Sequence, residues 1–224
     1  MAALVHLIRH AEVDNPNAVV CGSAPGFGLS PHGLDQARRV GRYLGPRPVV
    51  AIWSSPLERA LRTAEEIAAR SAVPVRVDAG LVEWSLQQRW QGKRWSDLER
   101  LFPGEIESYR NDPSHLPFAD ETLEELAERV STVAQRLDSE HPHGDVVVVS
   151  HEDAIQAARL RLRGADLGSL HRDKPSPGTV ITLRPGTTWH EETAWEPGKS
   201  TQFGDKADLR AVPGTPRIPD PTSA

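Results

Sequence analysis

Four consecutive valines, Val146–Val149, constrain the fold more than any other feature of this chain. β-branched residues favour extended backbone, and a run of them without an intervening polar residue suits a strand that is covered on both faces. A strand of that kind needs packing partners above and below the sheet, as in proteins whose strands and helices alternate. The run therefore predicts an α/β domain with a largely parallel sheet.

Further strands and helices alternate along the chain. Short, mostly apolar runs predict strands over residues 4–8, 49–53, 75–77 and 178–183, the last being the final strand. Helical spacing of apolar residues predicts helices over 31–44, from Ser54-Ser55-Pro56 onward, over 120–139 and over 153–163, with one or two short helices between 96 and 111. We therefore expect a three-layer sandwich, a mostly parallel central sheet with helices on both faces.

The chain divides near residue 185. Residues 1–185 carry the predicted strands and helices, whereas the hydrophobic period is lost beyond Pro185. Residues 197–224 include five prolines and three glycines but few aliphatic side chains. A segment of that composition buries little apolar surface. We expect an α/β domain over 1–185 and a C-terminal extension over 186–224 that is extended or partly disordered.

Composition narrows the classes of function. The formal net charge is -5, so no basic excess exists to drive binding to nucleic acid. The single cysteine, Cys21, excludes an intramolecular disulfide. No run approaches the roughly 20 apolar residues that span a bilayer, and the first residues lack the features of a signal peptide. We expect a cytoplasmic protein that binds neither nucleic acid nor a membrane, and any anion site must be local.

Cationic and imidazole side chains follow the predicted strands where each strand ends. Arg9 and His10 end the first strand, Arg59 lies just beyond the second, and His151 follows the valine-rich one. Ligands of open α/β sheets bind outside the carboxyl ends of the strands, so these side chains can converge on one crevice. Guanidinium groups give bidentate hydrogen bonds to phosphate oxygens. The pattern predicts a phosphate site.

Phosphoryl transfer needs a nucleophile, charge stabilisation and a proton for the leaving oxygen. An imidazole such as that of His10 can be the nucleophile, and Glu83 is the best-placed carboxylic acid to supply the proton. Structural roles remain alternatives from the residues alone. His10 could be a strand-end histidine bonded to backbone, and Glu83 could be a surface charge beside a strand.

Five segments resemble the histidine phosphatase superfamily, which includes cofactor-dependent phosphoglycerate mutases and many small phosphatases. They occur in the family's order and are Leu7-Ile8-Arg9-His10-Ala11-Glu12, Leu29–Ala37, Ser54–Ala64, Leu81-Val82-Glu83 and Val149-Ser150-His151. The resemblance spans residues 4 to about 183 and implies a phosphoglycerate mutase-like fold, on the phosphatase branch.

The resemblance also implies roles for single residues. His10 would become a phosphohistidine, while Arg9, Arg59 and His151 would hold the transferred phosphoryl group. Glu83 would protonate the leaving group and then help water attack. Asn15 lies one position from the family's usual phosphate-contacting asparagine and is carried over as a phosphate ligand. No metal and no cofactor are implied.

The resulting hypothesis is a metal-independent phosphatase that hydrolyses a phosphomonoester of a small metabolite through His10. A phosphoglycerate mutase-type phosphoryl transfer and a catalytically silent phospholigand-binding protein are the alternatives. The silent binder is motivated by Ala11 and Glu152, which stand where the family has glycine. A small phosphorylated substrate is the expected partner, and the sequence leaves a homodimer open.

Several orientations stay open at this level. Glu152 could point into the pocket or outward at the following helix N-terminus, where a carboxylate is favourable. Trp84, Trp90 and Trp95 could be core residues or a wall of the substrate site. Residues 120–122 are interpreted as a helix cap rather than as site residues, and Arg62 as a solvated helix residue.

Overall fold

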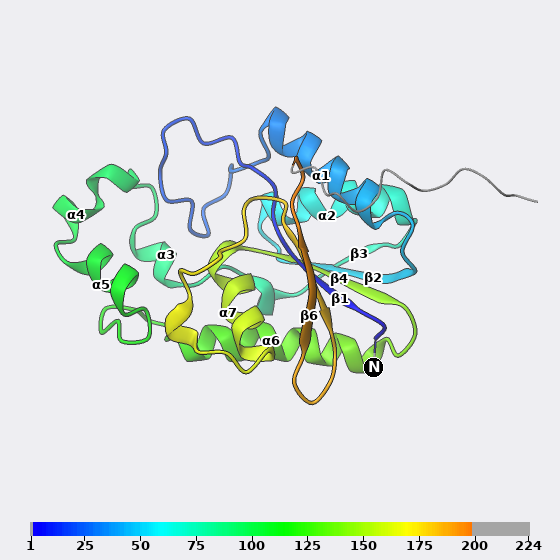
Figure 1. Ribbon diagram of the computed structural model, residues 1–224. Coiled ribbons are helices and arrows are strands. Elements are labelled where there is room, and N and C mark those ends of the chain that lie inside the picture. Colours follow the sequence, from blue (N-terminus) through cyan, green and yellow to red (C-terminus); the bar gives the residue numbers. More distant parts are fainter. Residues whose placement is uncertain (1, 199–224) are drawn as a thin grey trace, which may run out of the picture.

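A single six-stranded sheet forms the centre of the computed structural model, which describes residues 2–198 (Figure 1). Its order is β3-β2-β4-β1-β5-β6. The first four of these are parallel to one another, and β5 and β6 are antiparallel to their neighbours. The strands are β1 (Val5–Arg9), β2 (Val49–Ser54), β3 (Val75–Val77), β4 (Asp145–Ser150), β5 (Val180–Arg184) and β6 (His190–Trp195).

Helices cover both faces of the sheet, which confirms the predicted three-layer α/β architecture (Figure 1). One face carries α1 (Pro31–Leu44) and α2 (Glu58–Ser71), and the other carries α6 (Leu123–Glu140) and α7 (Glu152–Leu162). Shorter helices lie to one side of the layers in the figure: α3 (Leu86–Arg89), α4 (Leu98–Leu101) and α5 (Glu105–Asn111). Single 3-10 turns occur at Ala79–Leu81, Trp95–Asp97 and Leu167–Ser169.

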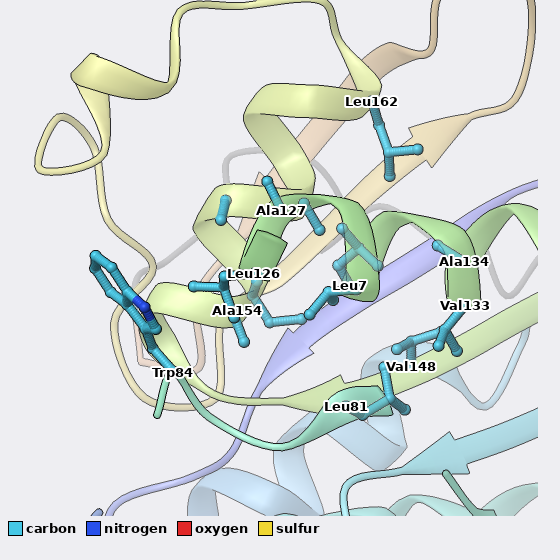
Figure 2. Packing of buried hydrophobic residues seen from close by; sticks show 14 of the residues in the cluster. Leu7, Leu81, Trp84, Leu126, Ala127, Val133, Ala134, Val148, Ala154 and Leu162 are labelled. Carbon is cyan, nitrogen blue, oxygen red and sulfur yellow. The ribbon is translucent and has the colours of Figure 1, made fainter. Parts of the chain in front are cut away.

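The valine run of β4 divides between the two hydrophobic cores. Val146 and Val148 belong to the core under α6 and α7, whereas Val147 and Val149 belong to the core under α1 and α2. All four side chains are fully buried. Figure 2 shows the first core, where Val148 and Leu7 of the sheet face the apolar side of α6. The period of two along a strand explains this division and the apolar character of the whole run.

Helices α1 and α6 begin at side-chain caps. Ser30 precedes Pro31, and its Oγ accepts a hydrogen bond from the backbone N–H of Gly33. Gly33 packs so closely against the backbone of Glu12 that a Cβ at position 33 would lie 2.0 Å from the carbonyl oxygen of Glu12, so only glycine fits this position. Thr122 forms a capping box with Glu125 at the start of α6. The capping interpretation therefore holds for Thr122.

The strand predicted over residues 178–183 is present as β5, but the expectation that it is the final strand is wrong, because β6 follows it and was not predicted. Strand β6 lies at the sheet edge, and most of its side chains are exposed. An edge strand of that kind carries no hydrophobic alternation for a sequence pattern to detect. Its Trp195 stacks on Tyr43 of α1, with ring centroids 4.2 Å apart.

The division of the chain at residue 185 stays a prediction, and residues 199–224 of the predicted extension lie outside the described residues.

Candidate functional site

A cavity of about 210 Å³ opens beyond the carboxyl ends of β1 and β4. Five of the six predicted site residues line it: Arg9, His10, Asn15, Arg59 and Glu83. The sixth, His151, is fully buried behind the wall, and its ring centroid lies 5.2 Å from that of His10. The structure therefore brings the predicted side chains together at the edge of the sheet where ligands of such folds bind.

His10 is held in one tautomer by its two ring contacts. It follows the end of β1, and its backbone N–H donates to the carbonyl of Ser150. Its Nδ1 donates to the carbonyl of Ala11 at 2.8 Å, so in the neutral ring Nε2 keeps a lone pair. Burial, followed by the charges of Arg59 and Arg9, holds the pKa of His10 well below its usual value. His10 is thus a neutral imidazole with Nε2 as its basic nitrogen.

Arg59 lies in the first turn of α2 and reaches this nitrogen. Its Nε donates to Nε2 of His10 at 3.2 Å, and one terminal nitrogen donates to the carbonyl of Gly22 at 2.8 Å. Gly22 has φ +51, and an added Cβ would lie 2.6 Å from Oε1 of Gln91, so glycine suits this close turn. Arg62, one turn further along, is exposed and pairs with acidic residues of its own helix.

His151 is oriented by a serine at the end of β2. Its Nε2 lies 2.8 Å from Oγ of Ser55, and that oxygen also accepts from the backbone N–H of Leu57 at 3.3 Å. The Nδ1 atom is buried without a hydrogen-bond partner among the described residues. Burial and the nearby charge of Arg59 hold the pKa of His151 well below its usual value. This ring is neutral and keeps one polar atom unsatisfied.

Glu83 follows the turn Ala79–Leu81 and reaches the start of α7. Its Oε1 accepts from the backbone N–H groups of Trp84 at 2.9 Å and of Ala154 at 3.2 Å. Burial, followed by the charge of Asp153, raises the pKa of Glu83 to about 7. At neutral pH this carboxyl group therefore exists in both protonation states.

Asp153 is a buried carboxylate that the sequence-based prediction missed. It accepts hydrogen bonds from Gln87 Nε2 at 3.0 Å and from the hydroxyl of Tyr109, and it pairs with Lys174 Nζ at 2.5 Å. Burial alone would raise the pKa of Asp153, but Lys174 and these hydrogen bonds lower it. Asp153, Gln87 and Tyr109 all line the cavity. The group contributes a fixed negative charge beside Glu83.

The carboxylate of Glu152 lies at the cavity wall, which resolves the orientation that sequence left open. It forms ion pairs with Arg9 through one oxygen and with Lys174, at 3.1 Å, through the other. Arg9 also donates from NH1 to the carbonyl of Pro175 at 2.8 Å. The second departure from the family pattern, Ala11, is fully buried, donates its N–H to Thr63 Oγ1 and lies outside the left-handed region. Alanine therefore fits that position.

The remaining candidates separate into structural and lining residues. Asn15 lines the cavity, yet its side chain also exchanges hydrogen bonds with the backbone of Val19. Trp84 and Trp90 are core residues, whereas Trp95 is 45% exposed and lines the cavity. Of the three tryptophans, two therefore belong to the core and one to the cavity wall.

Two of the residues that sequence analysis did not assign to the site, Ser55 and Asp153, could have been found from their positions in the sequence. Ser55 comes directly after β2, and Asp153 lies in the first turn of α7, just beyond β4, so both belong to the strand-to-helix junctions where site residues gather. Tyr109 and Lys174 had none, because Tyr109 comes from the short helix α5 and Lys174 from a loop, and neither follows the end of a strand. Within residues 2–198 no group of three or more His, Cys, Asp or Glu side chains could hold a metal ion. Likewise, none of the helices described is long and apolar enough to cross a membrane.

The fold and cavity define a class, namely α/β proteins with two guanidinium groups and a neutral histidine at the carboxyl edge of the sheet. The family model of the histidine phosphatase superfamily (branch 1) matches residues 5–195. The chain belongs to this superfamily, as the sequence motifs indicated.

Known proteins of similar sequence and structure include named phosphatases. An uncharacterised protein of Mycobacterium tuberculosis is 35% identical over 163 residues, which cover 73% of this chain and 80% of that protein. Phosphoserine phosphatase 1 of Hydrogenobacter thermophilus is 30% identical over 72% of this chain and 76% of its own. A mycobacterial glucosyl-3-phosphoglycerate phosphatase, solved with VO3, superposes with a TM-score of 0.78 at 26% identity and covers 87% of this chain and 99% of that one.

Proposed function

We propose that the protein is a phosphatase that hydrolyses a phosphomonoester of a small metabolite through a phosphohistidine on His10. The contact between Arg59 Nε and His10 Nε2 carries the proposal. It sets a guanidinium, the preferred partner of phosphate oxygens, beside the lone pair that would attack phosphorus. Named relatives, a phosphoserine phosphatase and a glucosyl-3-phosphoglycerate phosphatase, support a phosphorylated metabolite as the substrate.

In the first step, Nε2 of His10 attacks phosphorus and the bond from phosphorus to the ester oxygen breaks. The protonated carboxyl of Glu83 gives its proton to that oxygen, so the alcohol leaves neutral. The guanidinium groups of Arg9 and Arg59 stabilise the charge that develops on the phosphoryl oxygens. Arg9 must share its donors between phosphate and Glu152, since it contacts that carboxylate.

In the second step, the carboxylate of Glu83 takes a proton from water as the water oxygen attacks phosphorus. The bond from phosphorus to Nε2 breaks, inorganic phosphate leaves, and Glu83 is protonated again. A pKa of about 7 suits both duties, because each protonation state of Glu83 is accessible near neutral pH.

His151 would donate a hydrogen bond to the phosphoryl group that His10 carries, since the two rings are neighbours with centroids 5.2 Å apart. Ser55 Oγ already accepts from Leu57 N–H, so its own proton is free to donate to Nε2 of His151. The neutral ring then carries its proton on Nδ1, the atom without a partner among the described residues. An imidazole N–H in that state is a donor for a phosphoryl oxygen. Asn15 is kept as a phosphate ligand in the proposal. Its amide nitrogen donates to the carbonyl of Val19 at 2.8 Å and to Sγ of Cys21 at 3.6 Å, and a phosphate oxygen would replace the weaker thiol contact.

The test is a trapped intermediate. A ³²P-labelled phosphomonoester is mixed with wild type and with His10→Ala, and the reaction is stopped in alkaline denaturant, in which phosphohistidine survives. We expect label on wild type and none on the variant, together with release of inorganic phosphate by wild type. Label that persists in His10→Ala contradicts the proposal. Transfer of label to a second alcohol in place of water would indicate the mutase, and binding without turnover the silent binder.

A further inference from the structure

Glu152 is fixed at the cavity wall by two cations on opposite oxygens. Arg9 contacts Oε2 from the cavity side, and Lys174 lies 3.1 Å from Oε1. Lys174 is not among the residues that line this cavity and lines a second one instead. The two ion pairs restrict the rotamers of the Glu152 side chain. The carboxylate is therefore a permanent part of the wall.

The cavity is lined by more acidic than basic side chains, and the proposed function already uses the basic ones. Three carboxyl groups line it, those of Glu83, Glu152 and Asp153. Among the lining residues that the structure describes, the cationic side chains are Arg9 and Arg59, and the proposed function assigns both to the transferred phosphoryl group. Part of their hydrogen-bonding capacity is already used by protein carbonyls.

The rest of the wall is neutral. Val13, Val19 and Trp95 present apolar surface, and Trp95 is fixed by its backbone N–H to the carbonyl of Ala18. Gln87 and Tyr109 also line the cavity, but both already donate to Asp153. A second anionic group on the substrate would therefore meet carboxylates, apolar surface or engaged polar groups, and no unassigned lining cation within the described residues. Like charges brought together in a binding site repel each other. A neutral or cationic alcohol meets no such repulsion.

We propose that Glu152 is a specificity-determining residue, which selects phosphomonoesters of neutral or cationic alcohols and rejects those that carry a second anionic group. The proposal rests on the proposed phosphatase function and deepens it by naming the substrate class. It assigns a role to the carboxylate that stands where the resembling family has glycine.

The test compares two substrates of one skeleton. Glycerol 3-phosphate and 3-phosphoglycerate differ by a hydroxymethyl group against a carboxylate, and the ratio of their kcat/KM values is measured for wild type and Glu152→Gln. The ratio cancels any change in folded fraction and any effect of Glu152 on Arg9 that both substrates share. Glutamine keeps the size of the side chain and removes its charge. The control is Glu192→Gln, an exposed carboxylate on edge strand β6.

We expect wild type to favour glycerol 3-phosphate by about tenfold or more, the effect of one repulsive contact of ordinary size. Glu152→Gln should reduce this preference at least about fivefold, chiefly by a lower KM for 3-phosphoglycerate, and Glu192→Gln should leave it unchanged. A preference that persists in Glu152→Gln overturns the inference, as does a wild type that favours 3-phosphoglycerate.

Failure of the proposed function has its own readout. Hydrolysis of para-nitrophenyl phosphate by wild type tests that function, because this substrate lacks a second anionic group. If turnover is absent, the ratio of the two Kd values, from calorimetry with the same two esters and the same variants, tests the charge selection alone. An unchanged Kd ratio in Glu152→Gln overturns the inference there as well.

Discussion

Arg59 donates from Nε to Nε2 of His10 at 3.2 Å, while the same guanidinium donates to the carbonyl of Gly22. One side chain therefore connects helix α2, the proposed nucleophile and the loop that follows β1. The planar guanidinium donates hydrogen bonds from different nitrogens in these two directions, and the single ammonium group of a lysine cannot make both contacts.

Replacing Arg59 with lysine should reduce kcat/KM for para-nitrophenyl phosphate by about 100-fold or more, as loss of a charge-stabilising donor does elsewhere. Steady-state kinetics checks this, with circular dichroism as a check on folding. Arg62→Lys is the matched control, because Arg62 is exposed on the same helix. Activity within about twofold of wild type in Arg59→Lys would contradict the proposed role.

The pH profile should show the titration of Glu83. Burial raises the pKa of Glu83 to about 7, so the acid form needed for the first step is lost above that pH. For a substrate with a poor leaving group, kcat/KM should fall as pH rises through about 7. Asp153→Asn should move this limb to lower pH, because the charge of Asp153 contributes to the raised pKa. The role of Glu83 as the general acid is contradicted if wild type shows no fall of kcat/KM with rising pH, or if Asp153→Asn does not move that fall to lower pH.

The same shift makes stability depend on pH. The pKa of Glu83 in the folded state lies above its unfolded value, so its contribution is present at low pH and is lost as pH rises through about 7. Glu83→Gln should therefore raise the melting temperature relative to wild type at pH 8 and change it less at pH 5. The gain is bounded by roughly 3 kcal/mol, the free energy that corresponds to the full shift. Thermal unfolding at the two pH values measures the change in melting temperature, and an equal change at both values would contradict this prediction.

Ser55→Ala should lower activity through His151. The variant removes the hydroxyl that contacts Nε2 of the buried ring, so the ring loses its fixed orientation and tautomer. We expect kcat/KM to fall by about tenfold or more and unfolding to become easier by about 1–2 kcal/mol. Kinetics and denaturant unfolding measure the two effects. Ser139→Ala, at an exposed position of α6, should change neither, and full activity in Ser55→Ala would exclude this role of the serine.

A buried pair far from the cavity should affect stability alone. His6 contacts Asp145 through Nε2 at 3.1 Å and Thr182 through Nδ1 at 3.0 Å, near the amino ends of the parallel strands. Burial lowers the pKa of His6, so the ring is neutral at pH 7. Asp145→Asn should cost about 1–3 kcal/mol of unfolding free energy and leave kcat/KM unchanged. Asp35→Asn, in an exposed pair with Arg39, should cost less than about 0.5 kcal/mol.

Sequence patterns predicted the layers and the location of the site because both depend on local signals. The valines of β4 required cover on two faces, and Arg9, His10, Arg59 and His151 followed strand ends. Periodicity could not predict β6, whose side chains are mostly exposed. It also could not find Lys174, because a loop cation joins the acidic cluster only through tertiary packing.

The position of β1 in the sheet has a consequence for synthesis of the chain. Val5 is aligned with Val146 of β4 on one side and with Leu183 of β5 on the other. Ribosomes add about 5–20 residues per second, so this apolar strand waits roughly 10–40 s before both neighbours exist. An unpaired apolar strand is a template for aggregation. The nascent chain should therefore expose this apolar strand until β5 has emerged.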